Sequence, residues 1–338
     1  MAASRTSGQR QAGLVGGVDG VSIGRMRPVF LCAILAALPP GFARAEECPP
    51  PRLLNQVQMS RAGHGEVDLI PVTVNGTPEN FIFDTGGFVS QIGPAAAAAL
   101  HLPVQPGNRE LYDMRGVISR DQAQADSFTL GQVTRAHMAL QLSPNVGAFD
   151  GNPIDGILAL DMLSGADAEL DFGSDTLKLF SEDHCPGAGV TWKPPAVAVA
   201  PITLARNHIT VPVMLDGHEF QAVIDTGASD TALTEAAAKR IFGLTPGDAN
   251  TPRYGELNGD PALPTYIHWF KTLTFGQVSV GEPGVLVIPD DKSRDTARET
   301  LAIPELILGM DVLRNLHIYL AMGEKKIYVT PASQPAPK

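Results

Sequence analysis

Alternating apolar and polar residues occur twice along the chain in the same arrangement, each time around a two-residue turn. Residues 72–83 read VTVNGTPENFIF and residues 213–224 read VMLDGHEFQAVI, and the two segments align without a gap. Asn75-Gly76 and Asp216-Gly217 occupy the turns, and both dipeptides tolerate the positive φ that tight hairpins require. Each segment is therefore predicted to form a β-hairpin whose second strand leads into Asp-Thr-Gly.

The repeat continues downstream of both Asp-Thr-Gly turns in the same order. A short Ala-rich helix comes first, then two strands around a Gly turn, and finally an apolar run, an Asp, a helical turn and two strands. These segments span residues 93–102, 128–133 and 155–180 in the first copy and 234–244, 273–278 and 305–330 in the second. The repeat predicts two pseudo-symmetric, mostly β lobes of ordinary domain size.

Proline, glycine and alanine concentrate between the two copies, which is typical of a linker. Residues 185–201 are predicted to be this linker, with an N-terminal lobe at 46–184 and a C-terminal lobe at 202–330. Residues 331–338, PASQPAPK, are expected to form a disordered tail.

The N-terminal segment has the order of a secretory signal peptide. An apolar run at residues 29–38 follows two arginines and precedes Ala-Arg-Ala at 43–45. We therefore expect residues 1–45 to be removed and the protein to be exported, to a periplasm or to the medium. The apolar run is too short to span a bilayer, so no membrane span is expected in the mature chain. Met26 is a suitable start, which leaves open that residues 1–25 are a misassigned extension.

Two cysteines, Cys48 and Cys185, remain after removal of this segment. An even pair in an exported chain is typical of a disulfide, and two free thiols are the alternative. If formed, the disulfide would tie the mature N-terminus to the middle of the chain.

Charge and histidine spacing exclude other classes of function. The formal net charge is −11 at pH 7 and no basic stripe is present, so nucleic acid is not expected as a partner. The eight histidines show no spacing typical of metal ligands. Neither a metal nor a cofactor is expected.

The repeated turns place Asp84 and Asp225 at matched positions, each at the end of an apolar strand. One Asp-Thr-Gly is usually only a turn, because Asp and Gly favour turns. An acid at the end of a buried strand is costly to desolvate, so two at matched positions predict that the lobes bring them together. Two carboxyl groups in one site hold a single proton between them. The ionised acid can then activate a water while the protonated one donates to a carbonyl oxygen.

FDTG at residues 83–86, IDTGAS at 224–229 and LILGMDVL at 306–313 resemble the aspartic peptidases of the pepsin and retropepsin clan. The chain is most similar to bacterial retropepsin-like members that carry two lobes in one chain, and the resemblance covers residues 65–330. It implies a bilobal acid-protease fold, with two β-barrel-like lobes and an active-site cleft between them. It also implies a polypeptide substrate, and a water held by Asp84 and Asp225 as the catalytic pair.

The resemblance also implies supporting residues around the pair. Thr85 and Thr226 are expected to make hydrogen bonds between the lobes, and Gly86 and Gly227 to allow close approach of the two turns. The residues that complete the second turn are Ala228 and Ser229. Because Ala228 offers no hydroxyl donor, the pair is expected to work at weakly acidic to neutral pH.

A β-hairpin flap over the substrate is a further implication of the resemblance. In the first lobe it is predicted within residues 110–122, with Tyr112 as its aromatic residue and Gly116 near its tip. The counterpart in the second lobe is expected within residues 253–269.

Two matched acids, Asp161 and Asp311, lie at the start of the predicted helical turns. An acid there can accept hydrogen bonds from unpaired helix amides, so both are interpreted as N-cap residues rather than as a second catalytic pair.

The first copy departs from the pattern of the second at two places. It reads Gly87-Phe88 after its turn and has Ala159 where the second copy has Gly309. The main hypothesis is an exported, monomeric aspartic endopeptidase. The alternative is a catalytically weak or inactive protease-like protein that binds peptides or proteins of the cell envelope. Retention of both acids and both threonines favours the enzyme.

Overall fold

A computed structural model describes residues 49–63, 67–87, 89–112, 118–143, 146, 148–149, 152–190, 192, 198–205, 208–290 and 305–332. The chain divides into two units, residues 1–47 and 48–338, and every described residue belongs to the second unit. The predictions about the signal segment, residues 1–45, concern residues outside the described part.

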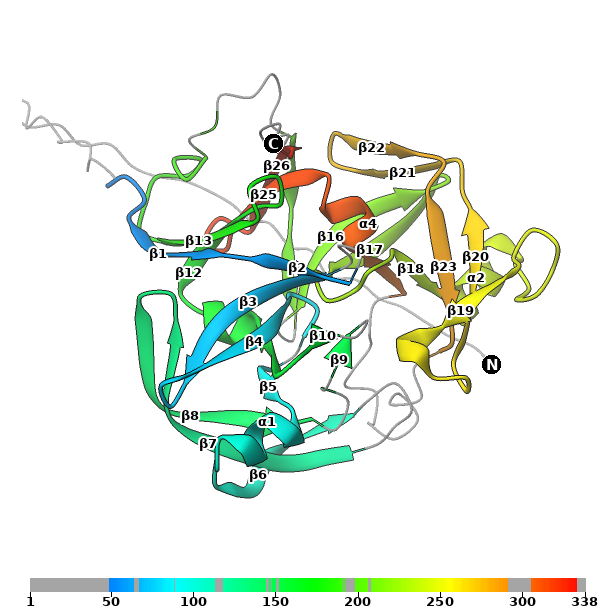
Figure 1. Cartoon of the computed structure of the whole chain (residues 1–338). Coiled ribbons are helices and arrows are strands. Elements are labelled where there is room, and N and C mark those ends of the chain that lie inside the picture. The colour runs from blue at the N-terminus through cyan, green and yellow to red at the C-terminus, as the bar shows by residue number, and fades with distance from the viewer. Residues whose placement is uncertain are drawn as a thin grey trace, which may run out of the picture. The chain divides into compact units, whose positions relative to one another are not determined.

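The first lobe is built on an eight-stranded sheet (Figure 1). In spatial order its strands are β2 (Ser60–Ala62), β3 (Val67–Val74), β4 (Thr77–Asp84), β11 (Gly156–Ala159), β5 (Gln91–Ile92), β8 (Val133–Leu142), β7 (Ile118–Leu130) and β6 (Val104–Tyr112). The predicted hairpin is formed by β3 and β4, with Asn75 and Gly76 at φ of 50° and 84°. A two-stranded sheet of β9 (Ala148–Phe149) and β10 (Asn152–Pro153) lies in the same half of the chain.

The second lobe repeats this plan in a ten-stranded sheet. In spatial order its strands are β19 (Arg253–Glu256), β20 (Pro264–Trp269), β23 (Gly284–Ile288), β18 (Ala232–Thr234), β24 (Leu306–Leu308), β17 (His218–Ile224), β16 (His208–Leu215), β21 (Thr272–Phe275) and β22 (Val278–Gly281), with β15 (Thr203–Ala205) paired to β16. The second predicted hairpin is formed by β16 and β17, with Asp216 and Gly217 at φ of 46° and 83°.

Short helices follow each Asp-Thr-Gly turn in the predicted order. They are α1 (Pro94–Ala99) and the 3₁₀ helix η1 (Leu160–Leu163) in the first lobe, and α2 (Glu235–Phe242), the 3₁₀ helix η2 (Leu257–Gly259) and α4 (Met310–Leu313) in the second. Thr234 caps α2 by accepting a hydrogen bond from the amide of Ala237, and Gly243 ends it with φ of 67°. The mostly β fold with two pseudo-symmetric lobes is therefore confirmed.

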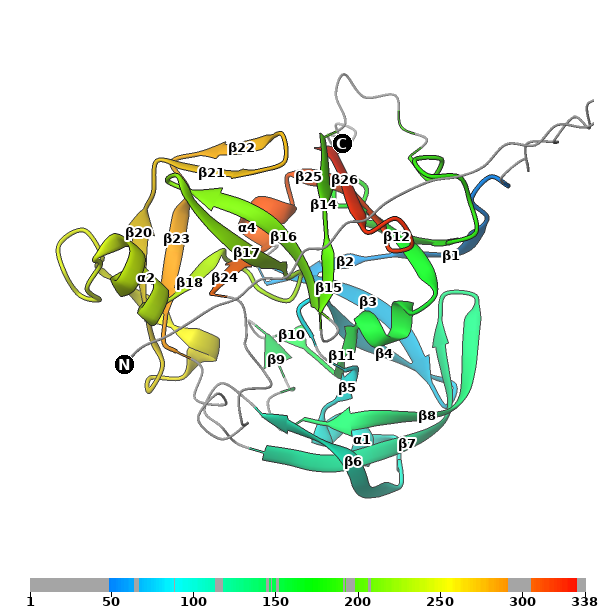
Figure 2. The same cartoon turned by 180° about the vertical axis from the view of Figure 1, so that it is seen from behind.

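The sequence analysis assigned the last two strands of each copy to that copy's own lobe. In the structure these strands leave their lobes. They meet in a six-stranded sheet with the order β1 (Leu53–Gln58), β13 (Thr176–Ser181), β12 (Ala166–Asp171), β25 (Leu316–Ala321), β26 (Lys326–Pro331) and β14 (Ala198–Pro201). Strands from both ends of the chain, blue and red in Figure 1, thus share one sheet. Figure 2 shows β14 beside β26, so the segment predicted as a linker ends in a strand.

Burial explains why these strands join. All six residues of β25 are buried, as are five of the six in β12. The backbone groups of two strands as buried as β12 and β25 need hydrogen-bond partners. The strands provide these partners for each other, because Ala168 pairs with Leu320 and Leu170 pairs with Ile318. The predicted tail also begins inside this sheet, because Pro331 is the last residue of β26.

Candidate active site

Two strand pairs bring the Asp-Thr-Gly turns to equivalent places. In the first lobe the parallel pairing of β11 with β4 sets Ala159 beside Asp84. In the second lobe the amide of Asp225 donates to the carbonyl of Leu308 (3.0 Å), the last residue of β24. The residue before each aspartate is fully buried. Each aspartate therefore stands where its chain leaves the core.

Four hydrogen bonds between the lobes join the two turns. The amide of Thr85 donates to Oγ1 of Thr226 (3.0 Å), and the amide of Thr226 donates to Oγ1 of Thr85 (3.1 Å). The hydroxyl of Thr85 donates to the carbonyl of Ile224 (2.6 Å), and the hydroxyl of Thr226 donates to the carbonyl of Phe83 (2.7 Å). Both threonines are fully buried. Because each donor finds its acceptor in the other lobe, these bonds fix the separation of the turns.

Each catalytic candidate lies over the first glycine of the opposite turn. A methyl group on Gly227 would lie 2.6 Å from the carboxyl carbon of Asp84, and one on Gly86 would overlap the carboxyl group of Asp225. Neither glycine has a positive φ among the described residues. Glycine is therefore required here for space, as the predicted close approach demands.

The two carboxyl groups are hydrogen bonded to each other, and burial raises the pKa of both. For Asp84, burial followed by the negative charge of Asp225 raises the pKa well above its usual range. For Asp225 the effect of burial is opposed by the hydrogen bond from Asp84 and by the amide of Gly227, which donates to Oδ1 (2.9 Å). At Asp84 the backbone amides of Gly86 and Gly87 likewise oppose the rise in pKa. The arrangement therefore favours one protonated and one ionised carboxyl group in the pair.

One oxygen of this pair has no partner within the protein. Oδ1 of Asp84 is buried and makes no hydrogen bond. A buried carboxyl oxygen is costly to leave unpaired, so this atom is suited to hold a polar group of a ligand or a water. The site thus contains a donor, an ionised acceptor and an unpaired acceptor within one small region.

Asp161 and Asp311 do not cap helices as predicted. The N-cap residues are Ala159 and Gly309, and neither makes a side-chain cap. The carboxylate of Asp161 instead accepts from the amide (3.1 Å) and hydroxyl (2.7 Å) of Ser90. That of Asp311 accepts equivalently, at 2.8 and 2.7 Å, from Thr231. The acids lie two residues after the N-cap residues, where they reach the loop after each Asp-Thr-Gly. Asp311 also accepts hydrogen bonds from the backbone of Asp311 and Val312 in α4.

The helix amides obtain their acceptors from the second turn itself. The amide of Met310 donates to the carbonyl of Ala228 (2.8 Å), and that of Asp311 donates to the carbonyl of Ser229 (3.0 Å). Ala228 and Ser229 thus connect the turn to α4 through their backbones.

The two departures in the first lobe lie against each other. A methyl group on Gly87 would lie 3.1 Å from Cβ of Ala159, which is fully buried, and 2.9 Å from Oδ2 of Asp84. The second lobe has the reverse pair, Ala228 in the turn and Gly309 behind it. The missing methyl of Gly87 is thus matched by the added methyl of Ala159. Phe88 lies outside the described residues.

His208 is a site residue that the sequence analysis missed. It is the first residue of β16, and its ring is hydrogen bonded to the backbone of Gly86 and feels the charge of Asp225. Burial lowers the pKa of His208, and these two interactions oppose that effect. One difference between the aligned copies could have indicated this residue: the second copy has His208 where the first has Val67.

Both predicted flap segments contain strands of a hairpin. In the first lobe Tyr112 ends β6 and pairs with Ile118 at the start of β7. Gly116 lies outside the described residues. In the second lobe β19 and β20 are antiparallel neighbours. The role of these hairpins as flaps stays a prediction. The Cys48–Cys185 disulfide also stays a prediction, because Cys48 lies outside the described residues.

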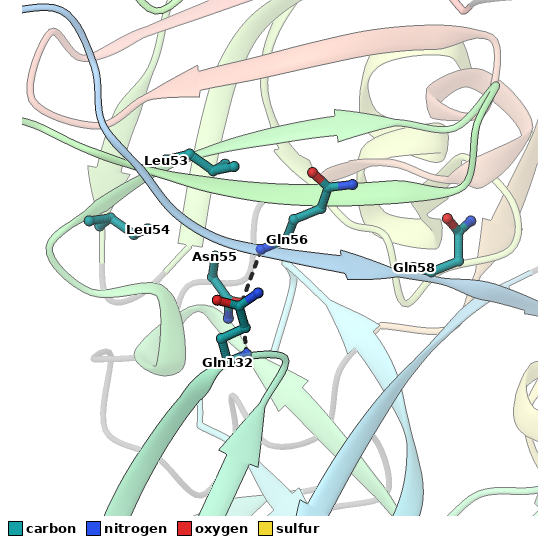
Figure 3. A pocket seen from close by; sticks show the side chains of 6 residues that line it. All are labelled: Leu53, Leu54, Asn55, Gln56, Gln58 and Gln132. Carbon is teal, nitrogen blue, oxygen red and sulfur yellow. Dashed lines mark hydrogen bonds between the residues drawn. The ribbon is translucent and has the colours of Figure 1, made fainter.

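A surface pocket of about 360 Å³ lies elsewhere (Figure 3). It is lined by Leu53, Leu54, Asn55, Gln56, Gln58 and Gln132. Oδ1 of Asn55 accepts from the amides of Gln56 (3.0 Å) and Gln132 (3.1 Å), which ties β1 to the turn between β7 and β8. The pocket shares no residue with the two Asp-Thr-Gly turns.

The part of the chain that the structure describes has neither a membrane-spanning helix nor a cluster of metal ligands. No helix there is long and apolar enough to cross a membrane. No group of three or more His, Cys, Asp or Glu side chains among those residues is arranged to hold a metal ion.

Comparison with known proteins agrees with the arrangement of the turns. The family model described as "Aspartyl protease" matches residues 70–162 and 211–312, one segment in each lobe. No curated protein matches the chain. Among solved structures, an aspartic proteinase from Irpex lacteus is similar, with 14% sequence identity, a TM-score of 0.45, and coverage of 82% of this chain and 97% of that one. The two matched segments carry both Asp-Thr-Gly turns, and the chain belongs to the aspartyl protease family.

Proposed function

We propose that the protein is an aspartic endopeptidase that hydrolyses peptide bonds with a water activated between Asp84 and Asp225. The observation that carries the proposal is the hydrogen-bonded pair of carboxyl groups, whose environments favour one protonated and one ionised acid. General acid–base hydrolysis requires this combination in a single site.

Proton transfers in the proposed reaction are balanced within the pair. The ionised Asp225 takes a proton from the water as its oxygen attacks the peptide carbonyl carbon. Asp84 donates its proton to the carbonyl oxygen, so the tetrahedral intermediate carries no full negative charge. When the C–N bond breaks, Asp225 gives its proton to the leaving nitrogen and Asp84 recovers one from the intermediate. The pair then returns to its starting state.

The proposal is tested with protein that begins at Glu46, a mixed peptide library and a series of pH values. Asp84→Asn and Asp225→Asn are each expected to lower kcat/KM about 10²- to 10⁴-fold, which is the usual contribution of a general acid or base. Asp126→Asn, an exposed aspartate on β7, is the matched control and is expected to keep full activity. Cleavage that persists in either catalytic variant would contradict the proposal.

Absence of cleavage by the unsubstituted protein at every pH would favour the alternative, a protease-like protein that only binds peptides. Peptide binding without hydrolysis, measured by calorimetry with the same library, would then identify that role. The match between Gly87 and Ala159 supports the enzyme, because it leaves the turn that holds Asp84 fully packed.

We also propose that the enzyme is exported and acts as a monomer. The apolar run at residues 29–38, with the arginines before it and Ala-Arg-Ala after it, supports export. Cell fractionation and sequencing of the mature N-terminus test it: a chain that begins at Glu46 outside the cytoplasm is expected. Non-reducing mass spectrometry of that protein is expected to show the Cys48–Cys185 disulfide, and light scattering is expected to show one chain per particle.

A further inference from the structure

His208 faces Asp225 across the hairpin that carries the second Asp-Thr-Gly turn. Thr210 on β16 pairs with Val223 on β17 at the end of their paired register. If that register is continued by two residues towards the Asp-Thr-Gly turn, His208 lies opposite Asp225. The first lobe has the same register: Leu69 pairs with Ile82, which sets Val67 opposite Asp84. The two members of the pair therefore have different cross-strand neighbours, a histidine for one and a fully buried valine for the other.

The histidine ring also reaches the opposite turn. It is hydrogen bonded to the backbone of Gly86, and its buried Nδ1 has no partner among the described residues. Gly86 is the residue whose Cα lies directly beneath the carboxyl group of Asp225. One imidazole thus contacts the peptide that supports Asp225 in the other lobe and stands beside Asp225 in its own.

We propose that His208 is a positioning residue of the pair, which fixes the Gly86 peptide beneath Asp225 and, when protonated, keeps Asp225 as the ionised acid. This inference rests on the proposed peptidase function, and it assigns the general base to Asp225 and the general acid to Asp84. The asymmetry arises because the first lobe has Val67 in place of a histidine. The charged groups that act on one another in this arrangement are Asp84, Asp225 and His208.

The direction of the pH effect follows from charge. A positive imidazolium favours the ionised form of Asp225, so it keeps that acid ionised at lower pH than a neutral side chain would. Above the pKa of His208 the ring is neutral, and Asp225 is ionised without its help. His208 is therefore expected to extend the acidic limb of the activity profile and to leave the plateau above it unchanged.

His208→Gln provides the sharpest variant, because glutamine keeps a hydrogen-bond donor but cannot carry a positive charge. The acidic limb of its kcat/KM profile is expected to move to higher pH by about one unit, the usual effect of losing a nearby opposite charge. One unit below the original limb this corresponds to a loss of about tenfold, whereas activity on the plateau is retained. His208→Val copies the first lobe and is expected to show the same displacement together with a lower plateau.

The control is His101→Asn, an exposed position with φ of 54° that asparagine also tolerates. Its profile is expected to coincide with that of the unsubstituted protein. Thermal unfolding of all variants checks that they are folded. If His208→Val does not fold, the test is made with His208→Gln alone. An acidic limb that stays in place in folded His208→Gln would overturn the inference.

A second readout does not depend on activity. With ¹³C in the aspartate carboxyl carbons, NMR titration follows Asp84 and Asp225 directly, and the two signals are assigned with Asp84→Asn and Asp225→Asn. Asp225 is expected to ionise first, and its titration is expected to move to higher pH in His208→Gln. If Asp84 ionises first, the inference is wrong. If the titrations behave as expected but no peptide is cleaved, the inference stands and the peptidase proposal fails.

Discussion

At the scale of single residues, the site depends on groups that are costly to bury. Asp84 and Asp225 end apolar strands, and each would be cheaper to expose to water than to leave beneath protein atoms. The lobes meet at these two residues, so each carboxyl group loses part of its hydration. When the two carboxyl groups share one proton, the free-energy cost of burying two nearby acids falls. The shared proton also leaves a hydrogen-bond donor and an acceptor side by side.

Thr85 provides the test of what holds the turns together. In Thr85→Val the carbonyl of Ile224 and the amide of Thr226 lose their partners while both stay buried. Each unsatisfied group costs about 1–3 kcal/mol, so we expect the free energy of unfolding to fall by roughly 2–6 kcal/mol. Chemical denaturation measures this change.

Thr85→Ser keeps the hydroxyl and is expected to recover most of that stability. Thr129→Val is the matched control, because Thr129 makes its hydroxyl contact with Thr134 on the exposed part of the β7–β8 hairpin. A loss in Thr85→Val no larger than that in Thr129→Val would show that the hydrogen bonds between the turns do not hold the lobes together.

At the scale of elements, each Asp-Thr-Gly turn works as a unit with the short strand and helical turn behind it. Ser90 in the first lobe and Thr231 in the second connect that strand to the acid of the helical turn: the amides of Ala159 and Gly309 donate to their hydroxyls (3.0 and 3.2 Å). The matched acids in the repeat were visible in the sequence. Their role was not, because it depends on a loop some 70 to 80 residues away meeting them in space.

Packing of Gly87 against Ala159 predicts a non-additive pair of substitutions. Gly87→Ala is expected to destabilise the protein by about 1–3 kcal/mol, the usual cost of adding a methyl group to a packed site. Ala159→Gly removes the opposing methyl. The double variant is expected to be more stable than the sum of the single effects by about 0.5–3 kcal/mol, as residues in contact show in such cycles.

Thermal or chemical unfolding of the four proteins measures this coupling. Part of the cost of Gly87→Ala is expected to remain in the double variant, because the new methyl also approaches Oδ2 of Asp84. Strictly additive effects would show that the two departures are unrelated.

At the scale of the whole described molecule, the six-stranded sheet contains buried ionisable side chains from both copies. Asp167 on β12 accepts from the ring of His184 (2.8 Å) and the hydroxyl of Tyr319 (3.0 Å), and the other ring nitrogen of His184 lies 2.8 Å from the carbonyl of Cys185. Both neighbours of the ring are acceptors, so the site favours a doubly protonated imidazole. These hydrogen bonds raise the pKa of His184 despite its burial.

A raised pKa in the folded state makes stability depend on pH. The contribution of His184 is complete below the pKa of an unfolded histidine, about 6.5, and is lost as pH rises through the higher folded value. The free energy of unfolding is therefore expected to fall as pH rises from about 6.5 through the higher pKa that His184 has in the folded protein. The fall is expected to be smaller in His184→Gln, and urea denaturation at each pH measures it.

His218→Gln, a substitution of an exposed histidine on β17, is the control and is expected to keep the full pH dependence. Because burial also raises the pKa of Asp84 and Asp225, the comparison between variants isolates the part of the pH dependence that belongs to His184. Equal slopes in His184→Gln and His218→Gln would exclude His184 as the source.

The sequence by itself determined the parts of this protein that depend on neighbours along the chain. Asn-Gly and Asp-Gly turns, alternating apolar positions and a repeat in constant order are local signals, and they predicted both hairpins, both helical turns and the two aspartates. Asp84 and Asp225 were found because the same local pattern occurred twice.

Only the tertiary structure decided what depends on residues far apart in the sequence. It showed the sheet shared by both copies, the match of Gly87 with Ala159, and the place of His208 beside the pair. No local pattern encodes these features, because each results from two segments meeting at a particular separation in space. The environment that distinguishes Asp84 from Asp225 is of this kind, since identical Asp-Thr-Gly turns acquire different pKa values only from the neighbours that the fold gives them.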